Sequence, residues 1–498
     1  MSGAVDPAAD DSGSVAGPGA QAGVLAQDGL AAEAQRLLAD LIRFDTVNPP
    51  GAERPLQEYL SALLSQAGFE CELIGAEPER PNLVARLCAR EGGSADDGPT
   101  LCYLGHVDTV LADPGEWTHD PWSGDVAGGY LWGRGAIDMK SQVAAEVAAA
   151  AALARSGWRP ARGELLLVAL VDEETGGALG AEWITREHPE LVRCDMLVNE
   201  GAGSVFEYGG PPARRYYGVC CAEKGVYRFT ITTTGVAAHA SMPNLGENAL
   251  LKMAPLLQRL GARQPSYELT DVPRAFLHAI GEDPADPAGS IARLRATDER
   301  LAQMFEPMLG VTFAPTRIEA SEKINVIPSK TVVKVDCRVP PGLGEAEVRR
   351  AIAEVLGPER GRGPVARGAD GTEARAAAGA AKGGAAGDEE SGFEIEFTER
   401  IPGNSSPADT PLMDEISRWV SEHDPGASAV PTILPGFTDS KHFRAAFPDC
   451  VAYGFFPQRH QSLLQTAPLM HAADERIDVR DLAYAAEFYR DLALRMLG

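Results

Sequence analysis

The chain has 498 residues, of which 71 are acidic and 45 are basic, and its formal net charge at pH 7 is −26. This charge disfavours nucleic acid and anionic membrane surfaces as partners, because binding phosphate requires clustered lysine and arginine. The length exceeds that of one ordinary hydrophobic core and predicts two domains.

The first residues and the cysteines predict where the protein works. Residues 1–28 contain Ala, Gly, Ser and Asp without the basic start and apolar run of a signal peptide, and we predict a disordered tail. The eight cysteines are scattered without a Cys-x-x-Cys pair, which favours a reducing compartment. No apolar run reaches the ~18 residues that span a bilayer. We therefore expect a cytoplasmic protein.

Apolar runs alternate with helical patterns in residues 29–212. Asn48-Pro49-Pro50-Gly51 is a strong breaker and ends a first helical pattern. Continuous apolar runs are typical of strands buried on both faces of an α/β sheet. We predict helices near 37–42, 56–68 and 143–154, and strands near 71–74, 83–87, 100–106 and 165–171. This alternation predicts a sheet covered by helices on both faces.

The pattern changes after residue 212, where strands alternate apolar and polar residues as a strand with one wet face does. We predict strands near 226–234, 331–339 and 393–397 and helices near 248–260 and 345–356. This order is ferredoxin-like and predicts a small α+β domain over residues 213–400, inserted into the larger domain. The larger domain resumes at 401–498. Residues 264–310 are long for a connection, and 358–391 are predicted to be a flexible linker.

Polar side chains follow the buried strands, where ligands bind in such sheets. Zinc takes imidazole nitrogen and carboxylate oxygen, and two ions ~3.5–4 Å apart can share a carboxylate and a water. Singly, these short motifs are common at strand ends and turns, but in this order they predict a metal site. The candidate ligands are His106, Asp138, Glu174, Glu200 and His471.

Two neighbours of these candidates have predicted supporting roles. Asp108 lies two residues after His106 on an extended chain, points the same way, and is suited to hold the imidazole by its other nitrogen. Glu173 and Glu174 face opposite sides if the chain is extended there, so one is a ligand and the other is left as a base.

Four motifs, residues 105–110, 133–140, 172–177 and 199–201, resemble the successive signatures of a dizinc amidohydrolase and peptidase family. The family includes acetylornithine deacetylase, succinyl-diaminopimelate desuccinylase, aminoacylase and glutamate carboxypeptidase. The resemblance extends from about residue 30 to the end of the chain. It implies a three-layer, mixed-sheet catalytic domain of zinc-exopeptidase type with an inserted ferredoxin-like α+β lid domain.

The resemblance also implies a role for each candidate. His106 and Glu200 would hold one Zn²⁺, Glu174 and His471 the other, and Asp138 would bridge them, with Co²⁺ or Mn²⁺ as substitutes. Glu173 would be the general base that deprotonates the water between the ions and later protonates the leaving amine. Asp108 would orient His106.

In the lid, the resemblance assigns residues that contact the substrate. His239, in the motif 235–243, would stabilise the oxyanion, typically from the partner subunit of a dimer. Asn325 and Arg338 match substrate-binding positions, and Arg338 is suited to a carboxylate. The structural alternative is that Arg338 pairs with neighbours of Asp336 on a wet sheet face. Thr438 is expected to line the pocket.

The predicted activity is therefore hydrolysis of the amide bond of an N-acyl amino acid or small peptide, by a deacetylase or desuccinylase, with a homodimer expected. A carboxypeptidase or dipeptidase is the alternative within enzymes. A non-catalytic relative that binds a peptide is the alternative from another class, and its mark would be a missing ligand or base. All five ligand positions and the base are occupied in this sequence.

Overall fold

The computed structural model describes residues 19–89, 98–357 and 392–498. The chain forms two compact units, the first from Met1–Asp195 and Phe456–Gly498 and the second from Met196–Phe455. Helix α1 (Gly19–Ile42) includes residues 19–28 of the predicted tail, whose disorder stays a prediction. Residues 1–18 and the predicted linker 358–391 lie outside the described residues. The predicted boundaries of the inserted domain, 213 and 400, differ from these units and stay a prediction.

The first unit is built on a sheet whose strand order is β1 (Glu70–Ile74), β2 (Asn82–Cys88), β6 (Glu164–Leu170) and β3 (Thr100–His106). β3 and β6 are parallel, and the other two pairs are antiparallel. Every residue of β3 and β6 is buried, as the continuous apolar runs predicted. Their carboxyl ends therefore lie side by side at one edge of the sheet.

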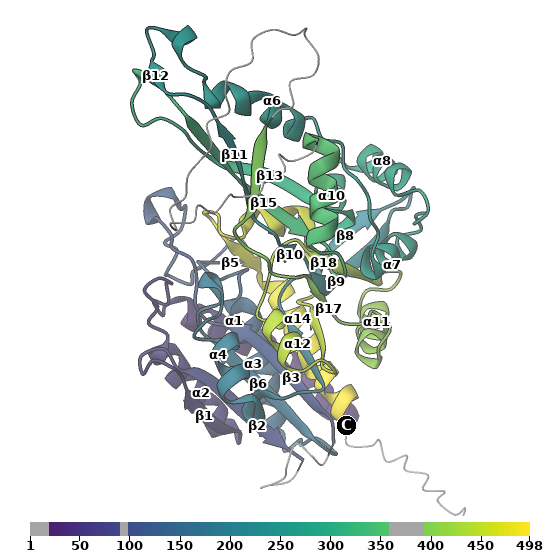
Figure 1. The fold of residues 1–498 in the computed structure, drawn as a ribbon. Coiled ribbons are helices and arrows are strands. Elements are labelled where there is room, and N and C mark those ends of the chain that lie inside the picture. The colour runs from purple at the N-terminus through teal and green to yellow at the C-terminus, as the bar shows by residue number, and fades with distance from the viewer. Residues whose placement is uncertain (1–18, 90–97, 358–391) are drawn as a thin grey trace, which may run out of the picture. The chain divides into compact units, whose positions relative to one another are not determined.

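Three helices of the first unit, α1, α3 (Lys140–Arg155) and α14 (Val479–Leu497), pack on one another, and α3 and α14 contact β3 and β6 (Figure 1). Alanines make up half of α3, and their small side chains allow it to be buried on nearly all sides. Helix α2 (Arg54–Ala67) covers β1 and β2. The remaining elements are η2 (Pro114–Glu116), β4 (Val126–Ala127), β5 (Tyr130–Trp132), η3 (Glu173–Thr175), α4 (Ala181–Glu187), α5 (Pro189–Val192), β20 (Gln458–Ser462), α13 (Leu463–Thr466), η6 (Ala467–Leu469) and β21 (Arg476–Asp478).

The second unit contains a sheet around the long strand β9 (Arg214–Glu223). β9 is antiparallel to β8 (Ser204–Tyr208) and β17 (Asn404–Ser405) and parallel to β18 (Ser428–Leu434). β19 (Val451–Gly454) pairs with β9 and runs parallel to β7 (Met196–Asn199). The helices of this part are α11 (Pro411–His423) and α12 (Ser440–Ala446).

The predicted ferredoxin-like order is present in the second unit: β11 (Phe229–Thr234), α6 (Ala249–Gly261), β13 (Thr312–Glu319), β15 (Lys330–Val339), α10 (Glu345–Leu356) and β16 (Phe393–Phe397). The strands lie in the order β13-β15-β11-β16, and all neighbours are antiparallel. Side chains from α6 and α10 join those of the sheet in one hydrophobic core. β13 is largely exposed and lacks apolar alternation, so the sequence pattern missed it. The unit also contains three short strands, β10 (Gly225–Val226), β12 (Ala238–His239) and β14 (Val326–Ile327). A short 3-10 helix, η4 (Pro243–Leu245), follows β12 in the chain.

Residues 264–310, which were too long for a simple connection, fold into helices that pack within the second unit. They are α7 (Asp271–Ala279), α8 (Pro287–Thr297), α9 (Glu299–Phe305) and η5 (Glu306–Leu309). Phe305 packs against Phe206 of β8, with ring centroids 4.9 Å apart. Lys224 Nζ donates to the carbonyls of Pro307 and Gly310 at 2.7 and 2.8 Å. Within the described part of the chain, no helix combines the length and apolar character needed to cross a bilayer.

Candidate metal centre

The ends of β3 and β6 place the first candidate residues. β3 ends at His106, and β6 is followed by Asp172, whose φ of 71° is in the left-handed region. That conformation turns the chain into the single helical turn η3, which begins with Glu173 and Glu174. The extended conformation considered for these two residues is therefore not the one adopted. Since β3 and β6 are parallel neighbours, His106 and the η3 turn lie at the same sheet edge.

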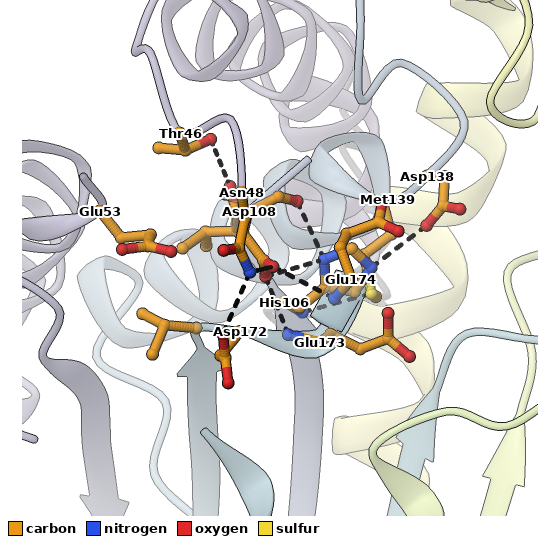
Figure 2. Close-up of polar contacts among 12 residues, drawn as sticks. Thr46, Asn48, Glu53, His106, Asp108, Asp138, Met139, Asp172, Glu173 and Glu174 are labelled. Carbon is orange, nitrogen blue, oxygen red and sulfur yellow. Dashed lines mark hydrogen bonds and ion pairs between the residues drawn. The ribbon is translucent and has the colours of Figure 1, made fainter. Parts of the chain in front are cut away.

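Asp138 lies between two imidazole rings (Figure 2 shows the His106 side). Its Oδ1 is 3.1 Å from His106 Nε2, and its Oδ2 is 3.1 Å from His471 Nε2. His471 Nε2 is also 3.2 Å from Glu174 Oε2. One carboxylate with a different imidazole at each oxygen is the arrangement that a bridge between two cations requires.

The backbone sets the tautomer of His106. Its Nδ1 lies 3.0 Å from the backbone oxygen of Asp108 and 3.4 Å from the Asp108 carboxylate. A carbonyl oxygen only accepts hydrogen bonds, so Nδ1 carries a hydrogen, and Nε2 is the ring nitrogen that faces Asp138. The Asp108 carboxylate accepts the backbone N–H groups of Glu173 and Glu174 at 3.2 and 3.1 Å. Asp108 therefore holds both His106 and the η3 turn.

The donor set fits divalent cations. Imidazole nitrogens and carboxylate oxygens, which are groups that ligate zinc, face one another here, and without a proton or a cation between them they would repel. Glu174 Oε1 is buried and has no hydrogen-bond partner among the described residues. An acceptor left unpaired in a protein interior is costly, and a cation would satisfy it. The residues present therefore fit a metal centre.

The pKa values of His471 and Asp138 also fit a site for cations. Hydrogen bonds to Asp138 and then Glu174 raise the pKa of His471 to about 10, against the effect of partial burial. Burial alone would raise the pKa of Asp138, but hydrogen bonds from His106 and His471 outweigh it and hold that pKa well below its usual range. Negative charge thus stays at Asp138, and in the metal-free protein a proton on His471 compensates it.

This shift gives a test on the metal-free protein. We expect the His471 imidazole to remain protonated at pH 8 and to lose its proton near pH 10, because two carboxylates accept from it. An NMR titration of histidine-labelled, chelator-treated protein measures this, with His471→Asn identifying the signal. In Asp138→Asn the pKa should fall toward the ordinary value of about 6.5. A His471 pKa near 6.5 in the unsubstituted protein would contradict the geometry described.

The sequence analysis did not identify Glu475, which holds the backbone at Asp138 by hydrogen bonds. Glu475 is fully buried, and its Oε1 accepts the backbone N–H groups of Ile137 and Asp138 at 2.6 and 2.9 Å. Its Oε2 accepts from Arg134 Nη1 at 2.7 Å. Burial raises the pKa of Glu475 to about 7. The available signal was its place four residues after His471, in the same segment.

The other predicted residues lie in the second unit. Glu200 directly follows β7 and is partly buried, and His239 on β12 is exposed, with its Nδ1 accepting from the backbone N–H of Ser241 at 3.2 Å. Asn325 is exposed. Arg338 donates to Asp336 at 2.7 Å, which is close to the structural alternative considered for it. Thr438 is buried, and its hydroxyl donates to Glu223.

Imidazole nitrogens and carboxylate oxygens that face one another at the edge of a buried sheet are typical of metal-dependent hydrolases with a dinuclear centre. The chain belongs to Peptidase family M20/M25/M40, whose model matches residues 102–495. This membership confirms the predicted resemblance and the predicted class of metallopeptidases and amidohydrolases.

Among curated relatives, a succinyl-diaminopimelate desuccinylase of Cereibacter sphaeroides (strain ATCC 17023) is 33% identical over 267 residues, which is 52% of this chain and 65% of the relative. The chain thus spans slightly less than two thirds of that relative's length. A desuccinylase from strain ATCC 17029 of the same species is 30% identical over 333 residues, 64% of this chain and 82% of the relative.

Solved structures share the fold at low identity. A metallo-carboxypeptidase of the M20 family from Sulfolobus solfataricus has a TM-score of 0.63 and 16% identity, covering 92% of this chain and 98% of that one. Human carnosine dipeptidase 1 has a TM-score of 0.60 and 15% identity, covering 95% and 98%. A dinuclear metal-binding peptidase of the M20 family from Bacillus subtilis has a TM-score of 0.55 and 14% identity, covering 94% and 99%. These neighbours confirm the predicted α/β fold class with its lid.

Proposed function

We propose that the protein hydrolyses the amide bond of an N-acyl amino acid, as a deacetylase or desuccinylase does. The observation that carries the proposal is Asp138, with a different imidazole at each carboxylate oxygen and Glu174 beside one of them. Relatives named succinyl-diaminopimelate desuccinylase support an N-acyl substrate. A small molecule of this kind is the proposed binding partner.

We infer two Zn²⁺ as the resident ions, with Co²⁺ or Mn²⁺ as substitutes. His106 and Glu200 would hold one ion and Glu174 and His471 the other, with Asp138 shared. The orphaned Glu174 Oε1 and the imidazole and carboxylate donors support this assignment. The ions would supply an activated water and polarise the substrate carbonyl.

The chain's own residues would move the protons. Glu173 is proposed to accept a proton from the attacking water and to deliver it to the leaving amine. Asp108 keeps Glu173 in place through the backbone of η3. His239 is proposed to stabilise the oxyanion: its Nδ1 accepts from Ser241, which leaves an Nε2–H as the donor in the neutral ring.

Asn325, Arg338 and Thr438 remain proposed substrate contacts. Arg338 would bind a substrate carboxylate, for which its planar guanidinium is suited. To bind a substrate carboxylate, Arg338 would have to break its ion pair with Asp336 or divide its guanidinium nitrogens between the two carboxylates. Asp336 also pairs with Arg228 at 2.9 Å, so it would keep a cationic partner if Arg338 turned to the substrate.

The acyl group and the reaction class are tested with the zinc-loaded protein on a panel of N-acetyl amino acids, N-succinyl amino acids and dipeptides. We expect the highest kcat/KM on an N-acyl amino acid. Fastest cleavage of dipeptides would favour the carboxypeptidase or dipeptidase alternative, which the names of two fold neighbours motivate. A fully loaded protein that binds these ligands and cleaves none would support the non-catalytic alternative.

The cellular setting is proposed from composition. The eight cysteines, all among the described residues, are not joined in disulfides, which favours a reducing compartment such as the cytoplasm. The net charge of −26 argues against nucleic acid and anionic membranes as partners.

A homodimer is proposed from an exposed apolar patch in the second unit, around β12, β14 and the start of α6. The patch comprises Val236, Met242, Leu245, Leu250, Leu251, Ile324 and Val326. Leu245 and Leu251 are each 70% exposed, and exposed apolar side chains in this part of the unit favour burial against a second copy.

We expect the double variant Leu245→Asp/Leu251→Asp to be a monomer, because two buried carboxylates would oppose association. Sedimentation velocity measures the change. Leu111→Asp is the matched control, since Leu111 is 71% exposed in the first unit. A wild-type protein that is monomeric at all concentrations, or a double variant that stays dimeric, would contradict this interface.

A further inference from the structure

We propose that Asn48 is a positioning residue, whose single amide nitrogen ties together the two buried carboxylates that hold the turn of Glu173 and Glu174. Its effect on turnover rests on the proposed function, whereas its effect on metal binding does not. Asn48 belongs to the Asn-Pro-Pro-Gly segment that the sequence pattern identified only as a helix breaker.

The contacts are direct. Asn48 is 5% exposed, and its Nδ2 donates to Asp108 Oδ2 at 2.8 Å and to Asp172 Oδ1 at 3.2 Å (Figure 2). The two shorter bonds go to carboxylate oxygens, which only accept, so the nitrogen of the amide must face them. A longer third contact joins the same nitrogen to Thr175 Oγ1 at 3.4 Å. Asp108 in turn accepts the N–H groups of Glu173 and Glu174, and Asp172 immediately precedes them.

Asp172 is held in its left-handed conformation by further bonds. It accepts from Thr175 Oγ1 at 2.6 Å and from the Leu179 N–H at 3.0 Å, and it pairs with Arg80 at 3.2 Å. Such a conformation is unfavourable for a residue other than glycine and persists only where its surroundings determine it. Asp172 therefore sets the start of the turn, and Asp108 holds its first two backbone N–H groups.

Charge explains why an amide is needed between them. Asp108 and Asp172 accept from the same nitrogen, so two buried carboxylates lie close together, and like charges in a protein interior repel strongly. Arg80 forms its shortest ion pair with a third carboxylate, Glu53, at 2.6 Å. Asn48 offsets the repulsion by donating to both aspartates, and it adds no charge next to the metal centre.

The Asn-Pro-Pro-Gly segment also packs against the side chain of Arg80. Asn48 is anchored by its N–H to the Thr109 carbonyl at 2.9 Å, beside the segment that carries Asp108. Gly51 has a φ of +80°, and a Cβ atom there would lie 2.3 Å from Arg80 Cζ. The guanidinium thus occupies the space that a side chain at position 51 would need. Asn48 and Gly51 together bring the amide and the cation to the turn.

Loss of the amide should displace both glutamates relative to Asp138. We expect Asn48→Ala to lower kcat by about 10–100-fold with little change in KM, as is typical when a partner outside the ligand shell is removed. We also expect Co²⁺ affinity at the weaker-binding site to fall about tenfold, with a changed visible absorption spectrum, because Glu174 is a proposed ligand.

Gln57→Ala is the matched control. Gln57 is a fully buried amide on α2 whose side chain donates to the Ala169 carbonyl at 2.8 Å rather than to an aspartate. It should lower the melting temperature by a similar amount while kcat and the Co²⁺ spectrum stay as in the wild type. If Asn48→Ala proves unstable, Thr175→Val removes the shortest hydrogen bond to Asp172 among the described residues, from an exposed position, and should lower kcat by about 3–10-fold.

The outcomes separate this inference from the proposed function. If the wild type binds metal but hydrolyses no amide, the proposed function fails, and the Co²⁺ spectra of Asn48→Ala and Gln57→Ala still decide the inference. The inference is overturned if folded Asn48→Ala keeps wild-type kcat and Co²⁺ spectrum, or if Gln57→Ala changes both to the same extent.

Discussion

Replacing Glu173 with glutamine is expected to lower kcat by about 10³-fold while the protein keeps its full metal content. Glutamine has nearly the same shape but cannot accept the proton of the attacking water. Glu173 is not among the proposed metal ligands, and its backbone N–H, which bonds Asp108, is unchanged by the substitution. The substitution should therefore remove the base while leaving the η3 turn undisturbed.

Single-turnover kinetics measure the loss of turnover, and elemental analysis of the same preparation measures its metal content. Glu190→Gln is the control, because the side chain of Glu190 is 67% exposed in the same unit. A Glu173→Gln protein with wild-type turnover would remove Glu173 as the base. One that had lost its metal would make Glu173 a ligand instead.

Asp138→Asn is expected to abolish activity and to weaken the binding of both ions. The loss of affinity should exceed the ~10–100-fold typical of removing an outer hydrogen-bond partner, because Asp138 lies between both imidazoles. An amide has one neutral oxygen and cannot offer a negative oxygen to each ion. Glu475 would still hold the backbone of residue 138, so the fold should survive.

Competition with a chelator measures this affinity, and thermal unfolding with and without zinc measures its consequence. Ligand at about 100 times Kd stabilises the native state by about 2.7 kcal/mol, so zinc should raise the wild-type melting temperature clearly. That rise should be absent in Asp138→Asn and present in Asp125→Asn, whose side chain is on the surface. Retention of two tightly bound ions in Asp138→Asn would contradict a shared carboxylate.

The residue pattern alone predicted the parts of the fold that depend on local sequence. The uniformly apolar runs predicted β3 and β6, because a strand with both faces covered has no polar side. The alternation in β11, β15 and β16 predicted the lid sheet. β13 was missed because it is an exposed edge strand, whose pairing with β15 rather than its own pattern decides its conformation.

The types of residue in the candidate metal centre could also be predicted from the sequence, since His, Asp and Glu side chains offer the nitrogen and oxygen ligands that it would need. Their contacts were decided by tertiary structure. Glu475 bonds residues more than 300 positions away in the chain, and Asn48 reaches Asp172 across 124. No local spacing encodes bonds of that kind. The η3 turn likewise depends on Asp108 and Asp172 being held together, because the left-handed φ of Asp172 is unfavourable by itself and is stabilised only by partners that folding brings to it.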